Sequence, residues 1–279
     1  MLLGPLSLDR YVDEGVILPG GGILNMAYHW SRQGLPFELV SRVGDDHAGL
    51  FLTFLHRHGI GATPDLVQPG RSASIDIRIG ADRQPHMDNF VDGVGASFRL
   101  TVAEEDRVGR ARHVHAVLVG AVAVEVRRLH DAGRTAGAEV AGDFLSLRRW
   151  TVEEFGAVMA ALDVAFIGWP GAPDDPLITG AADLARALGR LLVVTLGSRG
   201  VLVFDGRPGA PSERFFPIVA RPVTGTTVGC GDAFIAAFLA AWWAHHDVDG
   251  AVAAGALAGA AAVDWHRPLP DATYGDGAA

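Results

Sequence analysis

The sequence contains no lysine, so all of its permanently charged side-chain cations are arginines. A phosphate-binding site in this chain must therefore use arginine, backbone N–H groups or a metal ion. Cys230 is the single cysteine, which excludes an internal disulfide and indicates a reducing compartment. No apolar run reaches the length of a membrane span. The net charge of −9 disfavours nucleic acids and anionic membranes as partners.

The N-terminus has neither the basic start nor the long apolar run of a secretory signal peptide. We therefore expect a cytoplasmic location. The length of 279 residues is enough to bury a substantial core, in one domain or in one domain with a small appendage.

Helical and strand patterns alternate along the chain, which favours an open, mostly parallel α/β sheet with helices on both faces. The run at residues 191–196 is continuously apolar, as in a parallel strand covered on both sides. Residues 200–205 are expected to form a hairpin with the next segment of the chain. Further strands are predicted at 1–8, 37–43, 114–119, 139–141 and 164–167, and helices at 23–33, 49–58, 124–132, 152–161, 176–188, 233–244 and 248–265.

Residues 72–79 differ from the other strands because apolar and polar side chains alternate along them. This pattern is typical of a half-exposed strand. A return strand at 86–91, together with residues 10–18, would form a small sheet that acts as a lid; the alternative is an ordinary edge hairpin. We therefore predict one domain over residues 1–279, with lid segments near 10–18 and 72–98.

Two glycines with a small residue between them, Gly229-Cys230-Gly231, lead into Asp232 and an apolar helix. Glycines let backbone N–H groups approach an anion, and the start of a helix adds further N–H donors. A carboxylate beside such donors makes sense as a base that deprotonates an attacking hydroxyl during phosphoryl transfer. The alternative is an aspartate N-cap after a glycine turn.

Other polar or glycine-rich turns also come after predicted strands. Asp9 lies just past the first strand, Gly20-Gly21-Gly22 opens a helix that contains Asn25, and Thr195 to Gly200 end the apolar run. Ligands of open α/β sheets bind at the carboxyl ends of the strands. We therefore expect these turns to line one crevice.

These residues resemble the ribokinase/PfkB-type sugar kinases. One signature is Gly21-Gly22 with Asn25 and Ala27, and then Val43-Gly44-Asp45-Asp46; the second is residues 227–234. The spacing of the two signatures extends the resemblance over nearly the whole chain. Within the family, the stretch at 92–98 and the strand at 113–116 are most similar to fructoselysine 6-kinases.

The resemblance implies a role for each matching position, although each residue taken singly could equally serve a turn or a surface. The catalytic set would be Asp232 as the base with Gly229, Cys230 and Gly231 as the anion hole. The substrate-binding set would be Asp9, Gly21, Gly22, Asn25 and Asp92, and the nucleotide-binding set would be Thr195, Gly197 and Gly200, with residues 254–262 against the adenine.

The sequence departs from the family pattern at two places. Thr226 stands where the family usually has an aspartate that helps to bind a monovalent cation. Residues 168–171 lack the usual Asn-x-x-Glu motif, which helps to organise magnesium and phosphate. The metal ligands are therefore unknown, with Asp174 and Asp175 as other acids that could contribute.

The resemblance implies a kinase that uses ATP and Mg²⁺ to phosphorylate a hydroxyl of a small sugar or sugar derivative. The alternatives are a nucleoside kinase and a catalytically weak regulator that binds a sugar or nucleotide. We expect a small-molecule partner, no nucleic acid or membrane partner, and a possible homodimer that pairs through the lid. A Rossmann dehydrogenase is disfavoured because the first glycine turn does not have the Gly-x-Gly-x-x-Gly spacing.

Overall fold

The computed structural model describes residues 1–210 and 212–275, and the chain divides into two compact units. The first unit is Met1 with Arg99–Ala220, and the second is Leu2–Phe98 with Arg221–Ala279. Among the described residues, no helix combines the length and apolar character needed to cross a membrane. A single functional domain with a lid stays a prediction.

The first unit contains six strands in the order β14-β13-β12-β11-β10-β9. The strands from β9 to β12 run parallel, and β13 and β14 are antiparallel additions at one side. The apolar run forms the buried strand β12, and the predicted hairpin forms from β13 and β14. The bounds are β9 His113–Val117, β10 Glu139–Asp143, β11 Val164–Gly168, β12 Leu191–Thr195, β13 Val201–Asp205 and β14 Glu213–Phe216.

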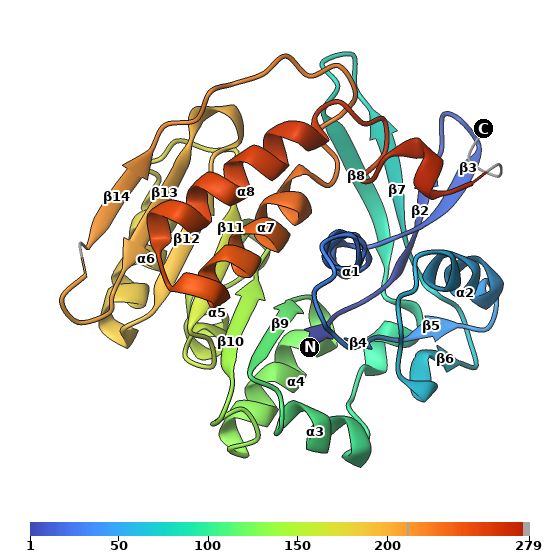
Figure 1. Ribbon diagram of the computed structural model, residues 1–279, viewed down its shortest axis with the longest axis horizontal. Helices are drawn as coiled ribbons and strands as arrows, with labels where there is room; N and C mark the ends of the chain where they lie inside the picture. Colours follow the sequence, from blue (N-terminus) through green and yellow to red (C-terminus); the bar gives the residue numbers. More distant parts are fainter. Residues whose placement is uncertain (211, 276–279) are drawn as a thin grey trace. The chain divides into compact units, whose positions relative to one another are not determined.

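Three helices connect the parallel strands, and a fourth, α3, precedes β9 (Figure 1): α3 Val102–Val108, α4 Gly120–Asp131, α5 Val152–Met159 and α6 Pro176–Leu188. Helix α6 has the predicted bounds because Asp175 caps its start and Gly189, in a left-handed conformation, ends it. Helix α3 was not predicted. The pattern that marks the start of α3 in the sequence is a capping box. In it, the Thr101 hydroxyl accepts a hydrogen bond from the Glu104 N–H, and the Glu104 carboxylate accepts one from the Thr101 N–H.

The second unit contains the short parallel pair β1 Leu2–Leu3 and β4 Leu39–Val40, and a separate four-stranded sheet. The prediction of one strand over residues 1–8 is wrong, because Gly4-Pro5 separates β1 from β2 and proline has no N–H for a ladder. The strand predicted over 37–43 is likewise divided, into β4 and β5 Val43–Gly44, which pairs with β6 Val67–Gln68.

The four-stranded sheet has the order β3-β2-β7-β8, with bounds β2 Ser7–Tyr11, β3 Val16–Gly20, β7 Ala73–Ile79 and β8 Pro85–Val91. We call it the small sheet. Residues 10–18 contain the end of β2, the turn of the β2–β3 hairpin and the start of β3. The motif at 43–46 anchors β7, because Asp46 Oδ1 accepts from the N–H and the hydroxyl of Ser72 at 2.9 and 2.8 Å.

The helices of the second unit are α1 Gly22–Arg32, α2 Ala48–Arg57, α7 Cys230–His245 and α8 Val248–Ala262. All four were predicted, within a few residues at each end. The short 3-10 turns η2 Gly93–Ser97 and η5 Asp271–Thr273 also belong to this unit. Figure 1 shows the red C-terminal segment beside β2 and β3, where Tyr274 packs against the apolar cluster of Tyr11, Leu18 and Ile77.

Candidate active site

The loop before α7 has the backbone geometry of an anion site. Gly229 is the N-cap of α7 with φ of +77°, and a Cβ there would lie 2.6 Å from Pro268 Cα. Only glycine fits this position without strain. Apart from its chain neighbours and the nearby backbone of α7, no atom lies within 4 Å of the place that a Gly231 Cβ would take, so the first turn has open space at that point. The N–H groups at a helix start lack partners within the helix and attract negative charge.

Asp232 lies in this first turn and is partly exposed. One of its carboxylate oxygens, Oδ2, accepts a hydrogen bond of 2.7 Å from Asn25 Nδ2. Burial raises the pKa of Asp232 to about 6, and the hydrogen bond from Asn25 opposes this rise. At neutral pH the group is therefore mostly ionised yet close to its pKa, which suits a general base.

Asn25 is brought to Asp232 by the glycine turn at the start of α1. Gly21 is the N-cap of α1, and its carbonyl accepts from the N–H groups of Leu24 and Asn25 at 2.9 and 3.1 Å. Gly22 is the first residue of the helix. Asn25 is buried, and its Oδ1 has no hydrogen-bond partner among the described residues. A donor on a ligand, such as a sugar hydroxyl, would satisfy this oxygen.

Asp9 is a second carboxylate of the same site, and its side chain is buried. It lies on β2, and its Oδ1 accepts a 3.0 Å hydrogen bond from the Ser7 hydroxyl. A Cβ at Gly20, its neighbour on β3, would lie 2.1 Å from the Asp9 carboxylate, so this close approach requires glycine. Burial raises the pKa of Asp9 to about 7; the Ser7 hydrogen bond lowers it, and the charge of Asp232 raises it further.

Ser7 and Gly20 were not predicted as site residues. The nearby sequence could have identified both. Ser7 is two residues before Asp9, so the two side chains lie on the same face of a strand, and Gly20 begins the glycine turn. Asp92 differs from the other predicted substrate residues. It is exposed before η2, and among the described residues it forms no hydrogen bond with Asp9, Asn25 or Asp232. Its substrate role stays a prediction.

The predicted nucleotide residues belong to the first unit, where they form the turn between β12 and β13. Thr195 ends β12, Gly197 opens a 3-10 turn, and the carbonyl of Gly200 accepts from the N–H of Leu196 at 2.9 Å. Arg199 in this turn donates to the carbonyls of Trp169 and Pro170, at 3.2 and 2.9 Å. The arginine thereby holds the segment that lacks the Asn-x-x-Glu motif.

Two other sequence features have structural roles. Asp175 caps α6, with its carboxylate accepting from the Leu177 N–H at 3.0 Å. Cys230 is partly buried, and burial, with the charge of Asp232, raises the pKa of its thiol to about 12. Small-residue packing therefore describes Cys230 better than thiolate chemistry. Within residues 1–210 and 212–275, no group of three or more His, Cys, Asp or Glu side chains could hold a metal.

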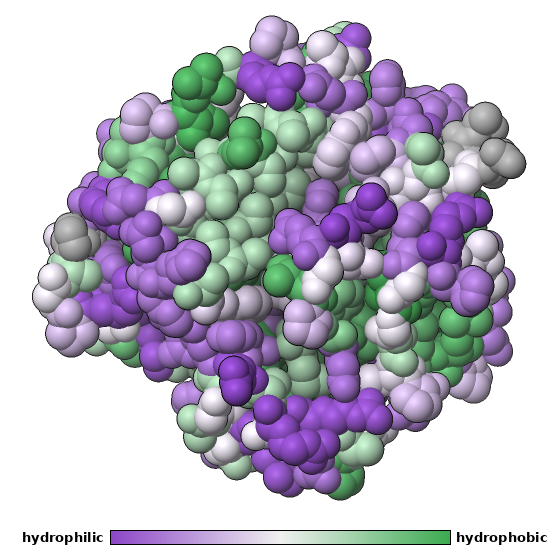
Figure 2. Space-filling view, in the orientation of Figure 1, coloured by the Kyte–Doolittle hydropathy of each residue, from purple (hydrophilic) through white to green (hydrophobic). Residues whose placement is uncertain are grey.

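Helix α8 provides an apolar surface. Leu257 is 76% exposed, and alanines and glycines make up most of the helix around it. In Figure 2 a large pale green area covers the place where Figure 1 draws this helix. An aromatic base could pack on such a surface, as predicted for residues 254–262.

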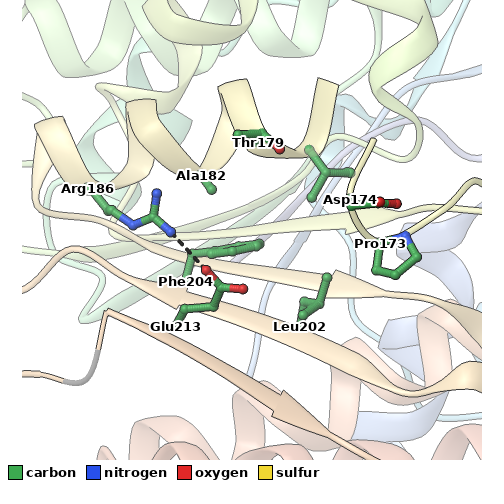
Figure 3. A pocket seen from close by; sticks show the side chains of 9 residues that line it. Pro173, Asp174, Thr179, Ala182, Arg186, Leu202, Phe204 and Glu213 are labelled. Carbon is green, nitrogen blue, oxygen red and sulfur yellow. Dashed lines mark hydrogen bonds and ion pairs between the residues drawn. The ribbon is translucent and has the colours of Figure 1, made fainter. Parts of the chain in front are cut away.

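A cavity of about 270 Å³ lies in the first unit between α6 and the strands β13 and β14 (Figure 3). Leu202 and Phe204 line it from β13, and Arg186 pairs with Glu213 across it at 3.2 Å. Asp174 also lines it, but none of the predicted catalytic, substrate or nucleotide residues does. The cavity therefore shares no lining residue with these three sets.

The chain is similar to known kinases along most of its length. Residues 6–268 match the family described as pfkB family carbohydrate kinase. Fructoselysine 6-kinase of Escherichia coli (strain K12) is 29% identical over 268 residues, which cover 95% of this chain and 97% of that protein. A cytidine kinase of Thermococcus kodakarensis is 26% identical over 269 residues, 87% of each chain.

The fold is similar to that of Arabidopsis thaliana ribokinase, solved in complex with ribose and ATP. The two have a TM-score of 0.79 at 20% identity, over 97% of this chain and 95% of that one. This likeness confirms the predicted ribokinase-like α/β fold.

The burial of Asp9 predicts a pH-dependent cost to stability. Between its usual pKa of 3.8 and its folded pKa of about 7, the folded protein keeps a proton that the unfolded chain releases. The free energy of unfolding contributed by Asp9 therefore falls as the pH rises through this window. Asp9→Asn removes the charge and can still accept from Ser7. Its stability relative to wild type should rise by at least about 1.4 kcal/mol, the equivalent of one pKa unit, between pH 4 and pH 8.

Urea unfolding at pH 4, 6 and 8 measures this difference. Asp88→Asn is the matched control, because Asp88 is an exposed acid on the same small sheet. A stability difference for Asp9→Asn that stays constant with pH would contradict the raised pKa.

Proposed function

Because this chain belongs to the pfkB family of carbohydrate kinases, we propose that it transfers the γ-phosphoryl group of ATP to a hydroxyl of a small sugar derivative, with Asp232 as the base. The observation that carries this proposal is the hydrogen bond between Asn25 and Asp232 at the glycine-rich start of α7. It joins the substrate part and the catalytic part of the predicted site. The proposal includes ATP as the phosphoryl donor. The complex of the similar ribokinase with ribose and ATP supports this part.

In the proposed reaction, the oxygen of the acceptor hydroxyl bonds to the γ-phosphorus of ATP, and Asp232 accepts the proton of that hydroxyl. The bond between the γ-phosphorus and the bridging oxygen breaks, and this oxygen leaves with ADP. The N–H groups of Gly229, Cys230 and Gly231 stabilise the charge that develops on the phosphoryl oxygens. Asn25 keeps the Asp232 carboxylate ionised and oriented. Asp9 accepts hydrogen bonds from other sugar hydroxyls, with Gly21 and Gly22 shaping the backbone beside it.

For the nucleotide we propose Thr195, Gly197 and Gly200 as contacts, with the apolar surface of α8 for the adenine. Magnesium would reach the site on the ATP phosphates and offset their charge. Magnesium commonly retains several water and phosphate ligands in kinase sites, so this arrangement assigns it no protein ligand.

The substrate class that we favour is a glycated amino acid or a related ketose derivative. The support is the 29% identity to fructoselysine 6-kinase over nearly the whole of both chains. A nucleoside is the second candidate, supported by the similarity to a cytidine kinase. A regulator that binds ligand without turnover is the third.

We expect an ADP-release screen over glycated amino acids, ketoses, aldoses and nucleosides, with MgATP, to identify the acceptor. Asp232→Asn should then lower turnover by about 10²- to 10⁴-fold, the usual contribution of a general base, while acceptor and ATP binding stay nearly unchanged. Asp131→Asn serves as the control, because Asp131 is an exposed acid at the end of α4 and belongs to none of the predicted site sets. Turnover within a few-fold of wild type in Asp232→Asn would exclude Asp232 as the base.

We also propose that residues 72–98, with the β2–β3 hairpin, close over the sugar and exclude water. Hydrogen exchange of this segment should be slower with acceptor bound than without it, whereas α6 should exchange equally in both states. Equal protection of 72–98 in both states would describe a static hairpin instead. Strand β8, which carries the exposed Met87 and Val91, is the proposed pairing edge of a homodimer.

Because Thr226 replaces the aspartate that is usual in the family, we predict that potassium has little effect on the rate of the enzyme. Its buried hydroxyl accepts from the Val228 N–H at 3.3 Å, and its N–H donates to the Trp265 carbonyl at 2.7 Å. The nearby acid Asp264 pairs with Arg221 and accepts from the Thr224 hydroxyl. A neutral hydroxyl supplies less charge to a cation than a carboxylate does. The steady-state rate should therefore vary little with potassium at constant ionic strength, held with a bulky organic cation.

Thr226→Asp introduces the missing carboxylate and should create a response to potassium. A rise of about tenfold in the rate of the native protein with potassium would contradict the expectation, because the loop would then bind the ion through other oxygens.

A further inference from the structure

The tip of the β7–β8 hairpin contacts the loop that precedes the anion site. Arg83 Nη1 donates to the carbonyls of Thr224 and Gly225, at 2.6 and 3.1 Å. The Thr227 hydroxyl donates to Gln84 Oε1 at 2.8 Å. In Figure 1 the turn between β7 and β8 meets the chain just before α7. These contacts join two segments that are more than 130 residues apart in sequence.

The tip itself is a closed turn with one unfavourable residue. The N–H of Arg83 donates to the Gly80 carbonyl at 2.8 Å, and the N–H of Gly80 donates to the Gln84 carbonyl at 2.9 Å. Arg83 has φ of +62°, a left-handed conformation that favours glycine over any residue with a Cβ. Strained residues that persist in a fold point to a role for their side chain. Here the guanidinium makes the contact to the loop.

The loop is held from two sides. On one side, the N–H groups of Gly225 and Thr226 donate to the carbonyls of Val263 and Trp265, at 2.8 and 2.7 Å. On the other side, Arg83 binds the carbonyls of Thr224 and Gly225. A peptide whose N–H and C=O groups are both bound has little freedom to rotate. The direction of this segment sets the entry of the chain into Gly229, where the N–H groups of the proposed anion hole begin.

The same hairpin is also tied to the sugar side of the site. Strand β7 pairs with β2 in parallel, with Asp9 opposite Ile75 and Tyr11 opposite Ile77. Asp9 and the hairpin tip are therefore parts of one continuous sheet. A shift of this sheet on sugar binding would move Arg83 and Gln84 relative to the loop.

We propose that Arg83 and Gln84 are positioning residues that fix the anion-hole loop relative to the small sheet. They thereby fix the distance and direction between an acceptor held by Asp9 and the N–H groups of residues 229–231. The effect that we predict on turnover rests on the proposed kinase function. The hydrogen bonds of Arg83 and Gln84 to the loop do not depend on that function. Misplacement of a reacting group by about 1 Å can lower a rate by about 100-fold, so a positioning contact affects kcat more than binding.

The decisive variant is Arg83→Gly. Glycine accepts the left-handed backbone of the turn more easily than arginine, so the turn should form at least as well and the Tm should not fall. Loss of the guanidinium should lower kcat by about 10- to 100-fold, with the acceptor KM changed by less than about threefold. Arg83→Lys retains the positive charge and one donor, and should recover part of kcat. Arg127→Ala, which removes another exposed arginine, should behave as wild type.

The contact between Gln84 and Thr227 is tested by a double-mutant cycle. Gln84→Ala and Thr227→Val should each lower kcat, and the double variant should lose little more than either single variant. Independent, multiplicative losses would overturn the positioning role of this pair. A kcat for Arg83→Gly within about twofold of wild type would overturn the role of Arg83.

Hydrogen exchange separates failure of the contact from failure of the kinase function. In the protein without ligands, Arg83→Gly should speed exchange of the amides in residues 224–231 and leave helix α6 unchanged. Unchanged exchange in 224–231 would overturn the proposed contact even in an active kinase. If wild type releases no ADP with any acceptor, the kinase proposal fails, and the exchange result alone decides whether the tip holds the loop.

Discussion

The hydrogen bond between Asn25 and Asp232 is the interaction on which the rest of the site depends. It joins the first turns of α1 and α7, two helices whose starts are separated by about 200 residues of sequence. Each helix begins at a glycine with positive φ, Gly21 and Gly229, so neither start has a side chain that competes for the space. The bond leaves Asn25 Oδ1 without a partner among the described residues, and therefore available to a ligand.

The desolvated carboxylates explain why such a site is costly to maintain. Burial raises the pKa of both Asp9 and Asp232, and the charge of Asp232 further disfavours ionisation of Asp9. Ser7 and Asn25 offset part of this cost through hydrogen bonds to the charged forms. Sugar hydroxyls, as donors, would offset more of it. A site that is unfavourable when empty is thus expected to favour a polyhydroxylated ligand.

The small sheet contacts the site at two places, through Asp9 and through the tip of the β7–β8 hairpin. Asp9 lies on β2, and the tip of the neighbouring β7–β8 hairpin reaches the loop before α7 through Arg83 and Gln84. The C-terminal segment adds a further connection, because Pro268 packs against Gly229 and Arg267 stacks over Tyr11 at 4.0 Å. The proposed acceptor side and the proposed anion hole are therefore supported by the same short segments.

The sequence by itself determined the alternation of strands and helices, the two glycine-rich helix starts and the identity of Asp9, Asn25 and Asp232 as candidates. Glycine turns, caps and apolar periodicity are local signals, and they survive in a single sequence. The breaks at Gly4-Pro5 and between β4 and β5 are also local, but a short strand is defined by its partner more than by its own residues.

Only the tertiary structure decided which candidates touch. It joined Asn25 to Asp232, set Ser7 and Gly20 around Asp9, left Asp92 exposed and placed Arg83 on the loop before α7. Contacts of this kind connect residues that are distant in sequence, and nothing in the local pattern at either end specifies the partner. The pKa values of the two carboxylates depend on the same contacts and on burial, so they too were fixed by the fold rather than by the residues alone.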